Sequence, residues 1–463
     1  MNLLRYLPRF RAAYRSLPLL AAREQWRRGE IESFQLERLN RVWQHAVAHV
    51  PHYREMAARQ RLPATFGSLA AFQAAVPILT KAEVRAEPKR FLSERRSPGI
   101  WRRTAGSTGI PLSVYWAHDA HWEVLRTQYR FYEAWNVDIF DRKVFLWGHA
   151  TCRPPGLSGW LGRFRMPIED RLRGRLRLSA CCVGRDDLRE YLRRIAGFRP
   201  VSLYGYSQSL CLLAREAEVA GFSCDSLRLA VLTSEPLLPS TVERVERVFG
   251  APAVSEYGST ECGLIAQEWP DRILRVREDT VLVETLPSEG RNHEIIVSPL
   301  NNPSFPLLRY NLGDATDAPL ERPERGFAVL KNVTGRPGDF LISRSGRYIH
   351  STWFDITLRY FSPAIRCFRI RQRADGSVWA AIELDGSDPP FDVAALEQRI
   401  REVVEGYPAR VEIVDSIPTT AVGKHRLVVS ELSQPTEKTA GNGGGTLEGS
   451  SNGSGGKCAC EQA

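Results

Sequence analysis

The chain has 463 residues, of which 43% are apolar and 25% charged, a composition typical of a folded protein with two or three domains. Its formal net charge is +10, and only seven of its 63 basic residues are lysines. Arginine is the better bidentate phosphate ligand, so the excess fits an anionic substrate, although general arginine usage explains it equally well. The basic residues are not interleaved with aromatic ones as in nucleic-acid modules, and we expect no nucleic-acid partner.

Cysteine usage and hydropathy bear on the cellular location of the protein and on whether it contains disulfides, zinc or a membrane span. The nine cysteines are odd in number and form no C-x-x-C pair, which argues against a disulfide framework or a zinc ribbon and predicts a reducing, cytoplasmic location. No apolar run is long enough for a transmembrane helix. Residues 1–20 place apolar side chains at helical spacing with arginines between them. This pattern fits a helix packed on its own domain or, less well, a basic helix in peripheral contact with a membrane.

The front of the chain, residues 1–75, is predicted to be helical, and a mixed α/β pattern follows. The first motif is Gly106-Ser107-Thr108-Gly109, which leads into a predicted strand over 110–116 and a helix over 118–135. Two hydroxyls between two glycines can turn successive backbone amides toward one anion. An ordinary glycine-rich hairpin turn explains the same residues, so this motif alone does not decide its function.

Buried strands then alternate with helices. The pattern predicts strands at 144–148, 201–206 and 229–234, with helices at 210–220 and 239–249. Residues 153–177, rich in Pro, Gly and Arg, are interpreted as a surface excursion. Alternation of this kind predicts a mostly parallel sheet covered by helices on both faces, with ligands at the carboxyl ends of its strands. Ser234, Glu235 and Pro236 fall at such an end.

Glycine turns and hydroxyl or carboxylate residues recur downstream. A short strand ends in Tyr257-Gly258-Ser259-Thr260-Glu261, and β-hairpins are predicted over 272–300. From residue 340 to 432 the pattern changes to a small α+β domain with an amphipathic helix over 393–404 and a strand over 409–414. From Ser433 the chain is rich in Gly, Ser, Thr and Asn, which predicts disorder.

Five motifs in this order resemble those of the adenylate-forming superfamily of acyl-CoA synthetases and adenylation domains. They are G106-S-T-G-I-P-L, Y257-G-S-T-E261, Y310-N-L-G-D314, G335-R-P-G-D339 and P418-T-T-A-V-G-K424, within residues 104–427. Within that superfamily the sequence most resembles the phenylacetate–CoA ligase group, including CapK-like proteins. The cues are the segment 50–54, the Ser-Glu-Pro segment at 234–236 and the overall length.

The resemblance implies a domain plan. Residues 1–337 would form a large AMP-binding domain with a helical front end, mostly parallel sheets and a β-rich subdomain. Residues 338–432 would form a small mobile lid, and 433–463 a disordered tail. In this superfamily the lid rotates between two half-reactions, with the hinge absorbing the change. Here Gly338 stands where the usual hinge motif has an acidic residue and only Asp339 remains, which puts the second half-reaction in doubt more than the first.

The resemblance also implies a two-step reaction. A carboxylate attacks the α-phosphorus of ATP, releasing pyrophosphate and leaving an acyl-adenylate, and a thiol or amine then displaces AMP. By similarity, the 106–109 loop would hold the β/γ phosphates, Thr260 would contact the α-phosphate, and Glu261 would bind magnesium. Tyr257 and Gly258 would border adenine, Asp314 would take the ribose hydroxyls, and Ser234, Glu235 and Pro236 would lie near the nucleotide. Arg336 would lie at the domain joint, and Lys424 would bridge the attacking carboxylate and the ribose-phosphate. Trp147, Tyr204, Tyr206 and Ser207 would line the acid pocket.

A structural zinc site is not expected, although several relatives carry one. The corresponding ligand positions in this chain are Trp269 and Arg275, and the later C-x-C is missing. The two-step reaction that the resemblance implies requires ATP with magnesium, a small carboxylic acid of aryl or acyl type, and CoA.

Three hypotheses about function remain open at this stage. The first is an acid–CoA ligase of the AMP-forming type. The second is the same adenylation followed by transfer to an amine, a sugar or a carrier-protein thiol in capsule or natural-product biosynthesis. The third is a nucleotide-binding descendant without catalysis, against which the presence of Glu261, Asp314 and Lys424 argues. A homodimer is the default expectation for the quaternary structure.

Overall fold

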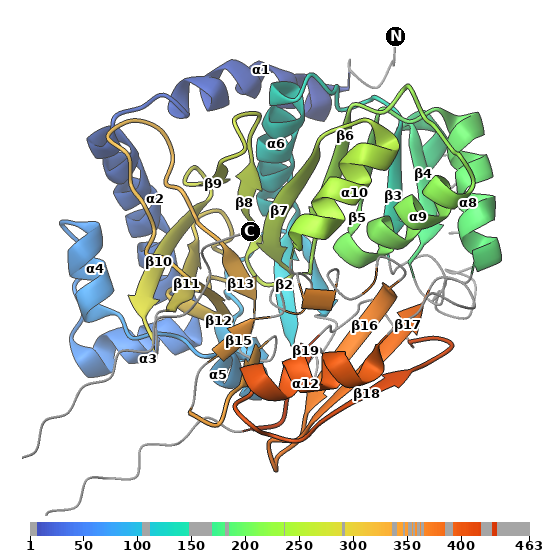
Figure 1. Ribbon diagram of the computed structural model, residues 1–463. Coiled ribbons are helices and arrows are strands. Elements are labelled where there is room, and N and C mark those ends of the chain that lie inside the picture. Colours follow the sequence, from blue (N-terminus) through green and yellow to red (C-terminus); the bar gives the residue numbers. More distant parts are fainter. Residues whose placement is uncertain are drawn as a thin grey trace, which may run out of the picture.

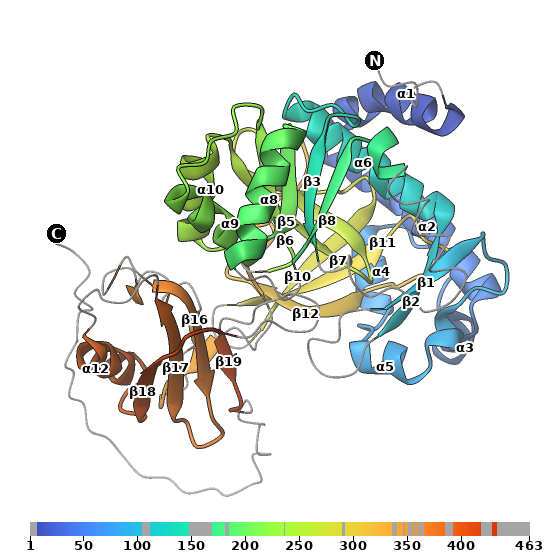
Figure 2. The ribbon, with the colours of Figure 1, turned by 90° about the vertical axis from the view of Figure 1, so that its right-hand side faces the viewer.

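The computed structural model describes residues 7–103, 112–147, 169–180, 185–235, 237–288, 292–335, 340–345, 348–350, 354, 357–358, 362, 365–384, 392–417 and 428–432. They form a large α/β body and a smaller α+β body beside it (Figures 1 and 2). No described helix combines the length and apolar character needed to cross a membrane.

Helices occupy the front of the chain, as predicted. They are α1 (Pro8–Arg23), α2 (Arg28–His49), α3 (Pro51–Gln60), α4 (Leu69–Ala75) and α5 (Lys81–Ala86), followed by the 3-10 turn η2 (Pro88–Phe91). The apolar stripe of α1 packs against α6 (His118–Ala134), where Phe10, Ala13 and Leu17 meet Tyr129. This packing uses the apolar face that a peripheral membrane contact would need.

A seven-stranded sheet forms the centre of the large body, with strand order β4-β3-β5-β6-β7-β8-β9. Its strands are β3 (Lys143–Trp147), β4 (Arg175–Ser179), β5 (Ser202–Tyr206), β6 (Leu229–Thr233), β7 (Ala253–Ser259), β8 (Gly263–Glu268) and β9 (Leu274–Val276). The first five in spatial order pair in parallel, and β8 pairs antiparallel with both β7 and β9. The predicted mostly parallel sheet is therefore confirmed.

Helices cover both faces of this sheet (Figure 1). On one face Leu146, Leu203 and Leu232 pack against α8 (Arg185–Phe198), α9 (Ser207–Val219) and α10 (Pro239–Phe249). On the other face Val231 and Val254 pack against Phe131 and Tyr132 of α6. A strand whose two faces are both covered needs the continuous apolar runs that the sequence displays.

The interpretation of residues 153–177 as a surface excursion is wrong at its end. Arg175 begins β4, and Arg175 and Arg177 pair with Lys143 and Phe145 of β3. Alternation of arginine with leucine from 175 to 178 is the period of a half-buried edge strand, in which long cationic side chains keep their charge near solvent.

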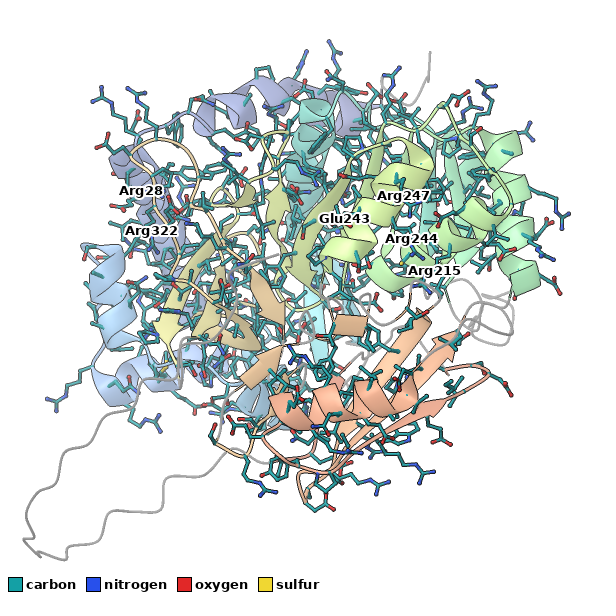
Figure 3. All side chains as sticks on the ribbon, viewed as in Figure 1. Arg28, Arg215, Glu243, Arg244, Arg247 and Arg322 are labelled. Atoms are coloured by element: carbon teal, nitrogen blue, oxygen red, sulfur yellow. The ribbon has the colours of Figure 1, made fainter. Side chains whose placement is uncertain are left out.

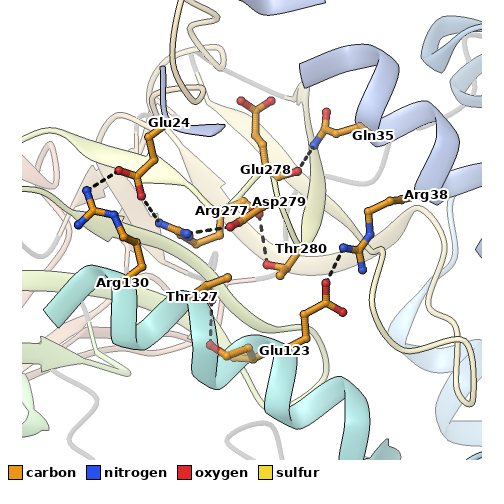
Figure 4. A network of polar contacts seen from close by, with 11 residues as sticks. Glu24, Gln35, Arg38, Glu123, Thr127, Arg130, Arg277, Glu278, Asp279 and Thr280 are labelled. Carbon is orange, nitrogen blue, oxygen red and sulfur yellow. Dashed lines mark hydrogen bonds and ion pairs between the residues drawn. The ribbon is translucent and has the colours of Figure 1, made fainter. Parts of the chain in front are cut away.

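A β-rich part completes the large body. It comprises the hairpin β1 (Gly99–Arg103) with β2 (Ser113–Ala117), and the sheet β10 (Val281–Pro287), β11 (His293–Pro299), β12 (Tyr310–Thr316) and β13 (Val333–Gly335). Polar contacts link it to the front helices. Arg28 bonds the carboxylate of the buried Glu278 at 2.8 Å, and the charge of Arg322 also acts on that carboxylate. Figure 3 labels both arginines. Nearby, Arg277 pairs with Asp279 at 2.8 Å (Figure 4).

The smaller body has its own sheet, in the order β18-β17-β16-β19. Its elements are β14 (Phe340–Ile342), β15 (Tyr348–His350), β16 (Ile365–Gln372), β17 (Val378–Leu384), α12 (Val393–Val403), β18 (Ala409–Ile413) and β19 (Val428–Ser430). The helix and strand predicted here differ by one residue each from α12 and β18. Leu238 of the large body joins this core. The predicted boundary at 337/338 and the tail 433–463 lie outside the described residues.

Candidate functional site

Part of the predicted site lies outside the described residues. These residues are Gly106, Ser107, Thr108, Gly109, Pro236, Arg336, Gly338, Asp339 and Lys424. The strands on either side of the first motif are described: β1 and β2 pair antiparallel out to Arg103 and Ser113. The Gly-Ser-Thr-Gly segment therefore connects two strands of a hairpin, as both interpretations of it require.

Parallel strands bring the remaining candidates to one edge of the seven-stranded sheet. The register aligns Leu146 with Gly205, Tyr206 with Thr233, and Thr233 with Glu256. The carboxyl ends of β3, β5, β6 and β7 therefore lie side by side and carry the predicted residues Trp147, Tyr206, Ser207, Ser234 and Tyr257.

Two of these residues have unusual local environments. Ser234 has φ 69°, a left-handed conformation that is uncommon outside glycine and often marks a functional turn. Ser207 is 1% exposed at the start of α9, and its hydroxyl has no hydrogen-bond partner within the described part of the chain. A buried hydroxyl without a partner is costly, so this position suits contact with a bound molecule.

Aromatic side chains form one wall of this edge. The Trp147 ring lies 4.3 Å from that of Tyr206 and 5.6 Å from that of Tyr204. The Tyr204 hydroxyl donates to Glu256 at 2.8 Å, and Gln267 donates to the other oxygen of that carboxylate, also at 2.8 Å. Burial raises the pKa of Glu256, although hydrogen bonds from Tyr204 and Gln267 act in the opposite direction. The predicted pocket residue Tyr204 is thus tied to a buried acid that motif analysis did not single out.

Tyr257 and Asp314 meet across two sheets. The Tyr257 hydroxyl donates to Asp314 Oδ2 at 2.9 Å, which links the end of β7 to β12. These two residues were predicted to border adenine and to take the ribose hydroxyls. The sequence separates them by more than fifty positions, and their contact depends on the packing of the two sheets.

Glu261 sits in the tight turn between β7 and β8. A Cβ on Gly258 would come within 2.6 Å of the Gly263 carbonyl oxygen, so this hairpin requires glycine at 258. The Trp116 indole N–H donates to the Thr260 carbonyl at 2.8 Å. Since Trp116 belongs to β2, the strand that follows the Gly-Ser-Thr-Gly segment contacts the Thr-Glu turn directly.

Lys81 is the residue that motif analysis missed. Its ammonium group lies 2.7 Å from Glu261 Oε1, and the Tyr310 hydroxyl approaches the same oxygen at 3.5 Å. Leu79 is bonded on both sides to β12, by Leu79 N–H to the Arg309 carbonyl and by Asn311 N–H to the Leu79 carbonyl. These bonds fix the start of α5 beside the site. The scarcity of lysine singled out Lys424, and the same signal applied to Lys81.

The charged side chains at the turn between β7 and β8 are largely buried. The Glu261 side chain is 4% exposed and that of Lys81 22%. Burial, reinforced by the charge of Glu261, raises the pKa of the Cys262 thiol well above its usual value, so this cysteine is no thiolate nucleophile at neutral pH. Glu261 Oε2 makes no hydrogen bond to the described residues. A carboxylate oxygen of this kind is a hard donor that suits magnesium, so Glu261 fits that ion.

The fold is similar to that of solved acyl-CoA ligases that form an acyl-adenylate, in agreement with the resemblance drawn from the five motifs. No family model matches the chain. A solved structure of 2-hydroxyisobutyryl-CoA ligase in the postadenylation state, with 2-HIB-AMP, has TM-score 0.69 and 19% identity, covering 88% of this chain and 91% of that one. The anthranilate-CoA ligase AuaEII with anthranoyl-AMP has TM-score 0.50 and 18% identity, covering 72% and 66%.

One curated relative is similar in sequence. Protein CapK of Staphylococcus aureus is 22% identical over 364 residues, which is 77% of this chain and 80% of CapK.

Proposed function

We propose that this protein activates a small carboxylic acid with ATP to an acyl-adenylate and then transfers the acyl group to CoA. The observation that carries the proposal is the meeting of Lys81, Glu261 and Tyr310 beside the Tyr257–Asp314 pair. These side chains come from three separate parts of the sequence and converge at the strand ends where α/β folds bind ligands. The ligase fold of the solved neighbours supports the same class of reaction.

The first step is adenylyl transfer. A carboxylate oxygen of the acid attacks the α-phosphorus, an O–P bond forms, and the bond to pyrophosphate breaks. Catalysis of this kind depends on positioning and on offsetting negative charge. In the proposal Glu261 holds a magnesium ion, which would offset phosphate charge when bound. Lys81 orients Glu261, Tyr257 and Asp314 bind the nucleoside, the 106–109 loop holds the leaving phosphates, and Lys424 contacts the attacking carboxylate.

Trp147, Tyr206 and Ser207 line the acid pocket in this proposal. Two aromatic rings 4.3 Å apart suit an aryl or medium-sized apolar acid, and the unpartnered Ser207 hydroxyl supplies one polar contact. Burial of this kind keeps water from the acyl-adenylate, which is the intermediate most easily lost to hydrolysis.

A second candidate is transfer to an acceptor other than CoA: an amine, a sugar hydroxyl or a carrier-protein thiol. Gly338 in place of an acidic hinge residue and the sequence similarity to CapK motivate it. Adenylation is common to both candidates, and only the second half-reaction differs.

A pyrophosphate-release assay over a panel of carboxylic acids tests the shared step. We expect at least one acid to support release that depends on ATP and magnesium, and Glu261→Gln to lower it about a hundredfold. ATP binding without release on any acid would instead favour a non-catalytic nucleotide-binding protein. Adding CoA separates the two candidates: acceleration supports the ligase, and adenylate turnover that CoA never accelerates supports the other acceptors.

A further inference from the structure

A cavity lies away from the candidate site. Its volume is about 730 Å³, within the range of small-molecule pockets. It is enclosed by α1, α2, the first turns of α6 and the segment after β11, and it opens to solvent. None of the residues proposed for adenylation lines it.

The lining of this cavity is basic. Arg9, Arg38, Arg41 and Arg126 contribute four guanidinium groups, against the two carboxylates of Asp119 and Glu123. With histidine neutral, the wall carries a net charge of +2 from these residues.

Two of the arginines are already neutralised by neighbours. Arg38 pairs with Glu123 at 2.5 Å and bonds the Leu300 carbonyl at 3.1 Å, as Figure 4 shows for the ion pair. Arg41 pairs with Glu37 on the outside of α2. Asp119 accepts a hydrogen bond from Ser97 at 2.9 Å. The two carboxylates of the wall, Glu123 and Asp119, therefore each interact with a residue other than Arg9 and Arg126.

Arg9 and Arg126 differ from these two. Within the described residues no carboxylate forms an ion pair with either of them, and Arg126 Nε is buried without any hydrogen bond. Asn301, which is 6% exposed and lines the same cavity, has a buried side-chain oxygen without a donor. Unpaired buried donors and acceptors cost free energy unless a bound molecule or water satisfies them.

Apolar side chains also line the cavity. Val42, Trp122 and Leu300 line it, and Arg9 stacks 5.4 Å from the centre of the Trp122 ring. A stacked guanidinium keeps its N–H edge free to bind an oxyanion. From this combination we infer that the cavity is a binding site for a phosphorylated small molecule whose apolar body rests on Trp122 and Leu300 and whose phosphate is held by Arg9 and Arg126.

The test uses 1-naphthyl phosphate as the probe and 1-naphthol as its uncharged match, titrated by calorimetry into the full chain at low salt. We expect one saturable site for the phosphate and at least tenfold weaker binding of naphthol. Arg126→Gln and Arg9→Gln should each weaken the phosphate about tenfold, as expected for loss of one charge-assisted hydrogen bond. Arg59→Gln, an exposed arginine on α3, is the matched control and should change nothing.

Location is tested with a variant of the other site. Lys81→Met removes a cation beside Glu261 and should leave the affinity for naphthyl phosphate unchanged. If this variant loses naphthyl phosphate binding, the probe binds at the candidate active site, and the inference is overturned. Equal binding of naphthol, equal weakening by Arg59→Gln, or no saturation at millimolar probe would each overturn it as well. Melting temperatures of the two pocket variants within a few degrees of the parent would show that lost binding is not lost folding.

Discussion

Single residues decide the electrostatics of the candidate site. Glu261 is almost fully buried, and a buried carboxylate is costly without a compensating charge. Lys81 supplies that charge from the first turn of α5, far from Glu261 in the sequence. The pair therefore orients the one carboxylate that the proposal assigns to magnesium.

Lys81→Met should lower the rate of ATP-dependent pyrophosphate release about a hundredfold, because Glu261 loses the contact that holds it in place. It should also raise the magnesium concentration needed for half the maximal rate, which a purely structural defect would not do. Steady-state kinetics over a magnesium series measures both quantities. Lys89→Met, on the exposed side of η2, serves as the control and should behave like the parent. Equal kinetics in the two variants would exclude a role for Lys81.

Glu256 makes stability depend on pH. Burial raises its pKa above the ordinary 4.5, so the folded chain holds a proton that the unfolded chain has lost. The stability this gives is complete below about pH 4.5 and disappears as the pH rises through the raised pKa. Glu256→Gln lacks the effect, and the Gln267 side-chain oxygen, which has no donor, can accept from the new amide.

We therefore expect the free energy of unfolding of the parent to fall relative to that of Glu256→Gln as the pH rises from about 4.5 through the raised pKa of Glu256, by about 1.4 kcal/mol for each unit of raised pKa. Urea unfolding at several pH values provides the measurement. Glu37→Gln, at an exposed position on α2, should give a difference that is nearly flat over the same range. A flat difference for Glu256→Gln as well would mean that this carboxyl is ionised throughout.

Among the elements, α1 illustrates how tertiary contact decides between two interpretations of one pattern. Its apolar stripe could cover its own domain or lie on a membrane. In the structure Phe10 packs edge-on to Trp122 and Phe140, at 5.6 and 5.1 Å between ring centres. The arginines of the opposite face remain outward. The helix is thus a layer of the large body.

A matched pair of leucines on α1 tests this packing. Leu17 is 6% exposed and Leu19 is 52% exposed. Leu17→Ala should destabilise the large body by about 2–5 kcal/mol, because it leaves a cavity against α6, whereas Leu19→Ala should change stability by less than about 0.5 kcal/mol. The shift of the first unfolding transition in urea measures both effects. Equal shifts would contradict the docking of α1.

For the whole molecule, the relation between the two bodies bears on the two half-reactions that we propose. The solved 2-hydroxyisobutyryl-CoA ligase gives TM-score 0.69 in its postadenylation state and 0.57 in its thioesterification state. The present chain therefore resembles the former arrangement more. Leu238 packs into the core of the smaller body in this arrangement.

If the smaller body delivers Lys424 to the reacting carboxylate, Lys424→Ala should lower acid-dependent pyrophosphate exchange about a hundred- to a thousandfold, because charge offset in the transition state is lost. ATP binding should change far less, since the proposal assigns most of the nucleotide contacts to the large body. The ratio of the exchange rates of parent and variant is measured with labelled pyrophosphate and the most active acid of the panel. Lys438→Ala, in the Gly/Ser-rich tail, is the control. Exchange at the parental rate in Lys424→Ala would refute the assignment.

Local pattern was sufficient for much of this fold. Buried strands such as 229–233 and amphipathic helices such as 239–249 were predictable because their period is set by which faces are covered. β4 was not predicted, because its alternating arginines look like solvent-facing loop residues until β3 provides a partner. Motif order indicated Glu261, Tyr257 and Asp314, but no local signal joined Lys81 to them.

The sequence by itself determined the class of fold and a mostly parallel sheet, and it supplied the residues from which an ATP-dependent acid-activating site is proposed. Those features follow from hydrophobic period, glycine turns and motif order, all of which are local along the chain. Only the tertiary structure decided that Lys81 pairs with Glu261, that Tyr257 bonds Asp314, that α1 covers α6 and that four arginines surround a separate cavity. Each of these is a contact between distant segments, fixed by how whole layers pack.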